Sequence, residues 1–142
     1  MNEFVYPEIK CGLYLVSLPV GCLSDISFRA LHMLSNSDYV AGEDTRSVRS
    51  LFKLLKISKS IKSIISYHDH SSAHTRGKII ELIKQGKSVA LVSDAGTPLI
   101  SDPGYKLVKT AIEEGFKVFS VPGPSSVIAA LTVSGLPTDT FS

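Results

Sequence analysis

The chain alternates short runs of β-branched residues with stretches that carry apolar side chains at helical spacing, and this alternation constrains the fold most. Five apolar runs are typical of strands and cover residues 12–16, 38–41, 64–67, 88–92 and 117–121. The stretches that follow them repeat apolar residues at the period of one helix face. Such a repeat predicts an α/β fold, an open five-stranded and mostly parallel sheet with helices on both faces and right-handed crossovers.

Capping residues and prolines predict where the five helices begin: after Ser24, at Asp44 or Thr45, at Ala73, at Asp102-Pro103 and at Pro124. Glycines just beyond the last apolar position predict three of the helix ends, at Gly86, Gly115 and Gly135. We expect residues 1–136 to form one domain and residues 137–142 to begin a linker.

Composition narrows the class of protein. With 142 residues, 44% hydrophobic and 20% charged, the chain suits one globular domain with a core. Its apolar runs, such as residues 89–92, are too short to span a bilayer, so we expect no membrane association. The first ten residues lack the apolar stretch of a secretory signal. Cys11 and Cys22 are therefore expected to be free thiols in a reducing compartment, the cytoplasm.

Loops at the carboxyl ends of parallel strands are where such sheets bind ligands. The longest is Ser93–Gly104, SDAGTPLISDPG, which has two glycines and two prolines. Asp102 alone reads as a helix cap, but twelve residues without regular structure favour a functional loop. The segment PGPSS, residues 122–126, places hydroxyls at a helix start, which suits an anionic group such as a carboxylate. A plain capped turn is the alternative there.

The loop after the first strand, SLPVGC, lacks the G-x-G-x-x-G pattern, so a standard dinucleotide site is not expected. The loop after the second strand places Glu43 and Asp44 before a helix, where acids also serve as caps. Basic residues then recur at i, i+3, i+7 and i+10: Arg46, Arg49, Lys53 and Lys56. A stripe of one sign can contact phosphates, although solvated surface is the plain alternative.

His68 and His70 alternate at a strand end, with His74 one turn on. Neither a cysteine nor a second carboxylate completes a closed metal site, so we predict no metal. Contact with a substrate is the better interpretation of these histidines.

Six segments occur in a diagnostic order: LYLVSLPVG, AGEDTRSVRSLF, ISYHDHS, LVSDAGTPLISDPGYKLV, VPGPSSVIAAL and SGLPTD. Together they resemble the bacterial methyltransferases of the tetrapyrrole methylase superfamily that methylate the ribose 2′-hydroxyl of a cytidine in 16S rRNA. The resemblance runs from Leu13 to Asp139, nearly the whole chain.

The resemblance implies a cytoplasmic, homodimeric enzyme that acts on 16S rRNA or the small ribosomal subunit. It implies that S-adenosyl-L-methionine binds between an N-terminal and a C-terminal domain. Transferred by position, the N-domain cofactor contacts are Val20, Thr97, Ile100, Ser125 and Ser126. The substrate contacts would be Arg46, Arg49 and His68, and the candidates for a catalytic base are Glu43, Asp44 and His70.

Some features depart from the family pattern. The chain ends where the second domain would begin, so we expect these residues alone to have little or no activity. Leu18 stands where the family has Thr, and Cys22 stands where it has Asn. Two other functions remain open, a small-molecule tetrapyrrole methyltransferase of the same superfamily and a non-catalytic module that dimerises or binds RNA.

Overall fold

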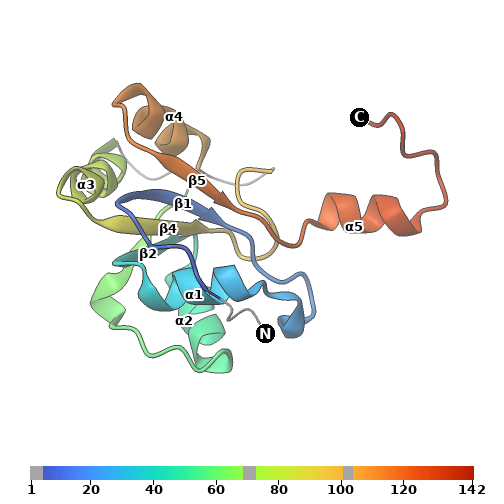
Figure 1. The fold of residues 1–142 in the computed structure, drawn as a ribbon, viewed down its shortest axis with the longest axis horizontal. Coiled ribbons are helices and arrows are strands. Elements are labelled where there is room, and N and C mark those ends of the chain that lie inside the picture. The colour runs from blue at the N-terminus through green and yellow to red at the C-terminus, as the bar shows by residue number, and fades with distance from the viewer. Residues whose placement is uncertain (1–4, 69–72, 101–103) are drawn as a thin grey trace.

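The computed structural model describes residues 5–68, 73–100 and 104–142 and shows an α/β unit with one projecting helix (Figure 1). The strands are β1 (Gly12–Val16), β2 (Tyr39–Gly42), β3 (Ile64–Ser66), β4 (Ser88–Val92) and β5 (Val118–Val121). The helices are α1 (Phe28–Asn36), α2 (Thr45–Leu54), α3 (Ala73–Lys84), α4 (Tyr105–Glu113) and α5 (Ser126–Val133). Two short 3₁₀ helices, η1 (Leu23–Asp25) and η2 (Ile61–Ser63), precede α1 and β3.

The strands form one sheet in the order β3-β2-β4-β1-β5, and every neighbouring pair is parallel. The register places Ala90 of β4 between Val40 of β2 and Tyr14 of β1. All residues of β4 are buried, as expected for a central strand covered on both faces. The predicted five-stranded α/β sheet is confirmed.

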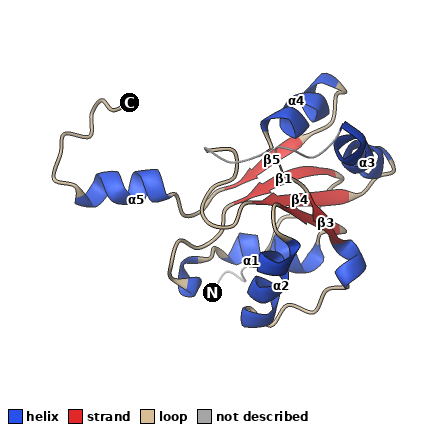
Figure 2. Ribbon diagram, turned by 180° about the vertical axis from the view of Figure 1, so that it is seen from behind, coloured by secondary structure: helices blue, strands red, loops and turns tan. Residues whose placement is uncertain are grey.

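Two helix layers cover the sheet, α1 and α2 on one face and α3 and α4 on the other (Figure 2). Strand β1 serves both layers, because Tyr14 and Val16 join the core under α1 and α2 while Leu13 joins the core under α3 and α4. Burying each such side chain contributes about 1.5–3 kcal/mol. Within the described ranges, no helix combines the length and apolarity needed to cross a membrane.

Two predicted helix starts, those of α1 and α5, were wrong by a few residues. Ser27 rather than Ser24 caps α1, accepting a hydrogen bond from the backbone N of Ala30, while Ser24 lies in η1. Asp44 caps α2, as predicted. Helix α4 begins at Tyr105 after Gly104, whose φ of 126° favours glycine, and the predicted opening at residues 102–103 lies outside the described residues.

The last helix differs most from expectation. It begins at Ser126 rather than Pro124, and it extends away from the sheet instead of covering it (Figure 1). None of its residues is buried, and the exposed fractions of Val127 and Val133 are 50% and 85%. Its apolar side chains are therefore unpacked, so the prediction of covering helices holds for α1 to α4. The domain boundary at residue 136 stays a prediction.

Candidate cofactor and substrate site

Three loops meet at the carboxyl ends of the adjacent strands β4, β1 and β5. They are the β1 loop (residues 17–22), the β4 loop (residues 93–100 as described) and the β5 loop (residues 122–125). Leu18 and Gly96 exchange both backbone hydrogen bonds, with N···O distances of 2.9 and 3.1 Å. Gly96 has a φ of 71°, a conformation that favours glycine. The β1 and β4 loops are thus joined by their main chains.

The Thr97 side chain connects all three loops. Its hydroxyl donates to the carbonyl oxygen of Pro124 at 2.9 Å, and Ser17 Oγ lies 3.0 Å from Thr97 Oγ1. The backbone N–H of Ser17 also donates to Val121 O at 3.2 Å. A Cβ on Gly123 would lie 3.0 Å from Ser17 Cβ, so glycine allows the β5 loop to approach this closely. Thr97 therefore fixes the junction from which α5 starts.

The predicted cofactor residues lie around this junction. Val20 is partly exposed, and its Cγ2 would be 3.5 Å from a Cβ on Gly96. Ser125 is the N-cap residue of α5, but its side chain makes no capping hydrogen bond. Ser126 is the first helical residue. The N–H groups of the first turn of a helix have no intrahelical acceptor, so those of α5 are available to a ligand. Ile100 is exposed farther along the β4 loop.

The predicted catalytic acids differ in their surroundings. Asp44 accepts hydrogen bonds from the backbone N (2.8 Å), Nε (3.2 Å) and Nη2 (3.2 Å) of Arg46. These side-chain and backbone hydrogen bonds from Arg46 lower the pKa of Asp44, and the same pair raises the pKa of Arg46. Glu43 is exposed beside it, and its carboxylate has no partner in the described part of the chain. His70 lies outside the described residues.

The basic stripe is shorter than the sequence predicts. Helix α2 ends at Leu54, and Lys56 follows the C-cap residue with a φ of 55°, so it leaves the helix face. Arg46, Arg49 and Lys53 remain on α2, all exposed. Nη2 of Arg49 donates to Thr45 Oγ1 at 3.2 Å, which orients that guanidinium at the start of the helix.

The predicted histidines are not brought into one described cluster. His68 follows β3 and is half-buried, whereas His74 is exposed in the first turn of α3. In the ranges that the structure describes, no three His, Cys, Asp or Glu side chains gather as a metal site would require.

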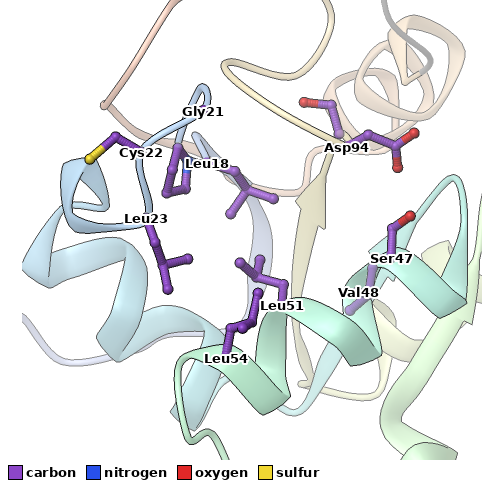
Figure 3. A pocket seen from close by; sticks show the side chains of 11 residues that line it. Leu18, Gly21, Cys22, Leu23, Ser47, Val48, Leu51, Leu54 and Asp94 are labelled. Atoms are coloured by element: carbon purple, nitrogen blue, oxygen red, sulfur yellow. The ribbon is translucent and has the colours of Figure 1, made fainter.

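A pocket of about 260 Å³ lies between the β1 loop and α2, and we call it the β1–α2 pocket (Figure 3). Aliphatic side chains make much of its lining: Leu18, Leu23, Leu51 and Leu54. Leu18, the departure from the family pattern, is 3% exposed, so its side chain belongs to the core and to the pocket wall.

Polar groups occupy the two sides of this pocket. Ser47 and Asp94 lie together on one side and Cys22 on the other (Figure 3). Sequence reasoning missed Ser47 and Asp94 as site residues. Asp94 could have been found from the sequence, because it lies in the β4 loop that was already expected to be functional. Ser47 lies on α2 between Arg46 and Val48, and the spacing of the basic residues there gives no sign of it.

Residues 12–142 match the family model of the tetrapyrrole (corrin/porphyrin) methylases. The chain belongs to this family. A tetrapyrrole methylase of solved structure, cobalt precorrin-4 methyltransferase, matches 86% of this chain and 49% of its own with a TM-score of 0.64 at 22% identity. Diphthine synthase matches 88% of this chain and 49% of its own with a TM-score of 0.67 at 21% identity. At these identities the structural likeness shows the fold alone.

Curated relatives are more similar in sequence. Ribosomal RNA small subunit methyltransferase I of Mesorhizobium japonicum is 50% identical over 140 residues, which are 99% of this chain and 47% of that protein. The protein of that name from Rickettsia prowazekii is 50% identical over 133 residues, 94% of this chain and 46% of the relative. The chain thus spans about half the length of the curated relatives that it matches.

Members of this family use S-adenosylmethionine. The residues at the loop junction fit such a ligand. The free N–H groups and hydroxyls at the start of α5 suit its carboxylate, and the exposed side chains of Val20 and Ile100 suit its less polar parts.

Proposed function

We propose that these residues form the cofactor-side part of an enzyme that methylates the ribose 2′-hydroxyl of a cytidine in 16S rRNA. The observation that carries the proposal is the junction at Thr97, which holds three loops and the start of α5 at one edge of the sheet. The 50% identity to rRNA small subunit methyltransferases supports the substrate class.

When bound, S-adenosylmethionine supplies an electrophilic methyl group on its sulfonium. The residues of this chain bind the cofactor and orient it. We assign the carboxylate of the cofactor to the N–H groups of α5 with Ser125 and Ser126, and apolar contacts to Val20 and Ile100. Thr97 acts by fixing the loop geometry, and such positioning is the main contribution that a protein makes to this reaction.

We assign the RNA contacts to the exposed cations that follow β2, with His68 at the end of β3. Arg46 and Arg49 stand on the first turns of α2, and the side chain of Arg46 is 86% exposed despite its pair with Asp44. Phosphate contacts of this kind make affinity fall as salt rises. A small tetrapyrrole substrate would show a weaker dependence on salt, which separates that alternative.

Among the candidate bases, the surroundings favour Glu43. Asp44 is engaged by Arg46 and has a lowered pKa, which makes it a weaker proton acceptor. Glu43 has an exposed carboxylate without a partner in the described residues. His70 remains a candidate on the resemblance alone.

The proposal also includes a homodimer in the cytoplasm. The exposed apolar side chains of α5, such as Ile128 and Val133, support association with another surface. Sedimentation velocity over a range of protein concentrations tests the dimer.

Calorimetric titration of this chain with S-adenosylhomocysteine, the demethylated product, tests the cofactor assignment. We expect saturable binding that Thr97→Val weakens up to about tenfold, because the hydroxyl ties the three loops together. Thr110→Val is the matched control, since that hydroxyl bonds only to Lys106 O within α4.

Two results would contradict the assignment. One is a chain that binds no S-adenosylhomocysteine at millimolar concentration although circular dichroism shows it folded. The other is an equal effect of Thr97→Val and Thr110→Val, which would place the ligand away from the junction.

A further inference from the structure

Resting on the proposed function, we propose that the β1–α2 pocket receives the base of the target nucleotide, a cytosine, and that Asp94 accepts a hydrogen bond from its exocyclic amino group. The inference assigns a substrate class to a pocket that contains none of the residues expected to bind the cofactor.

The volume and the aliphatic walls of the pocket suit a single ring system. Its volume of about 260 Å³ is below the roughly 300–1,000 Å³ typical of sites for drug-sized ligands. Leu18, Leu51 and Leu54 supply aliphatic surface against which ring faces can pack. Such a space is large enough for a single nucleobase.

The polar groups of the pocket distinguish cytosine from uracil. In the described chain, the Asp94 carboxylate and the Ser47 hydroxyl have no hydrogen-bond partner, and they lie on the same side of the pocket (Figure 3). The Ser93 hydroxyl is already bound to Ala95 O at 2.9 Å. An ionised carboxylate only accepts, so it matches the amino group of cytosine and repels the corresponding oxygen of uracil.

The surroundings suit a nucleotide rather than a free base. Arg46 directly precedes Ser47 at the start of α2 and its side chain is exposed, so a phosphate that flanks a bound base can meet positive charge there. The pocket shares the β1 loop with Val20 and the β4 loop with Thr97, and the Leu18–Gly96 pairing joins these two loops. A base in the pocket would therefore lie beside the residues expected to bind the cofactor, and recognition of splayed-out bases in such pockets is common in enzymes that modify nucleic acids.

Cys22 provides a reporter at the rim, because the residue lines the pocket and its exposed thiol lies 3.1 Å from Ser24 Oγ, on the side away from Ser47 (Figure 3). Cys11 precedes β1, at the opposite end of the sheet. In a Cys11→Ser variant, the rate of Cys22 alkylation by iodoacetamide is measured with cytidine, uridine or adenosine 5′-monophosphate. We expect cytidine monophosphate to slow alkylation saturably. Uridine monophosphate should require a concentration about tenfold higher, given the discrimination that one good base contact provides.

Asp94→Asn tests the specificity directly. An amide both donates and accepts hydrogen bonds, so cytidine and uridine monophosphate should protect Cys22 equally well in this variant. Asp25→Asn is the matched control, because Asp25 lies three residues from Cys22 but does not line the pocket, and it should keep the preference for cytidine.

Three results in the Cys11→Ser protein would overturn the inference. They are no protection by any of the three nucleotides, equal protection by all three, and stronger protection by adenosine monophosphate than by cytidine monophosphate. Titration of the same sample with S-adenosylhomocysteine separates the two proposals. Cofactor binding without nucleotide protection removes only the base pocket, whereas loss of cofactor binding counts against the proposed function.

Discussion

At the start of α2, Asp44 caps the helix and pairs with Arg46 through one carboxylate. Both contacts require the ionised form, which is why the pKa of Asp44 lies below its ordinary value of 3.8. A lowered pKa in the folded state means that the contribution to stability is complete above pH 3.8 and is lost as the pH falls through the folded pKa.

We therefore expect Asp44→Asn to be less stable than the original chain near neutral pH, with the difference shrinking as the pH falls below 3.8. Urea unfolding across that range measures it. Arg46→Gln should reproduce most of the effect, because hydrogen bonds from the Arg46 side chain are the largest cause of the shift. A stability difference between Asp44→Asn and the original chain that does not change with pH would contradict this account.

The residues of the site were predictable where local rules apply. Asp44 as a helix cap follows from its position before an apolar period. Lys56 was assigned to the helix stripe because helix ends are poorly marked, and its positive φ is visible only in the structure. The position of Ser47 and Asp94 on one side of the pocket depends on how the β4 loop approaches α2, and no spacing in the sequence encodes that approach.

Among the elements, the approach of α2 to the sheet depends on a glycine at the end of β2. A Cβ on Gly42 would lie 2.7 Å from Val48 Cγ2 and 3.2 Å from Val92 Cγ2. Both valines are buried and stiff, so neither can move away cheaply. The position of α2, and with it Arg46 and one wall of the pocket, follows from this contact.

Gly42→Ala should lower the free energy of unfolding by about 1–3 kcal/mol, because it overpacks the core. Gly77→Ala is the matched control, since Gly77 is exposed within α3 and a Cβ there meets nothing within 4 Å. That variant should gain about 0.5–1 kcal/mol from better helix propensity. Urea denaturation compares the two, and effects of the same sign would show that the contact with Val48 is unimportant.

The elements themselves were predicted by period and strand composition, and their order along the chain is as expected. The errors are at helix boundaries, at the starts of α1 and α5 and at the end of α2. Ser24 and Ser27 both suit an N-cap, and only packing of the first helix selects Ser27. Before the last helix, Pro122 and Pro124 favour an extended backbone, and the helix begins two residues after Pro124.

On the scale of the whole molecule, four helices share the cores while α5 stands apart (Figure 1). Its apolar composition predicted a packed face, but the described chain offers it no partner surface. An apolar composition indicates that the side chains of a helix become buried, but it does not indicate which surface buries them. The helix has 8 residues, and isolated helices below about 12–15 residues are marginal in water.

We expect backbone amides of α5 to exchange hydrogen far faster than those of β4 at protein concentrations where sedimentation shows a monomer. Mass spectrometry of peptic fragments measures both segments in one sample. Protection of α5 equal to that of β4 would mean that the helix packs in solution.

A chain that ends at Ser125 should keep the urea midpoint of the original, because residues 126–142 contribute nothing to either core.

The pairing of Leu18 with Gly96 uses only main-chain atoms. Nearly every residue type supplies those atoms, and only proline at position 18 would remove the donor. The residue type at position 18 can therefore change the wall of the pocket while the main-chain bonds that join the two loops remain. In this part of the chain, the backbone holds the loops together and the side chains shape the adjoining cavity.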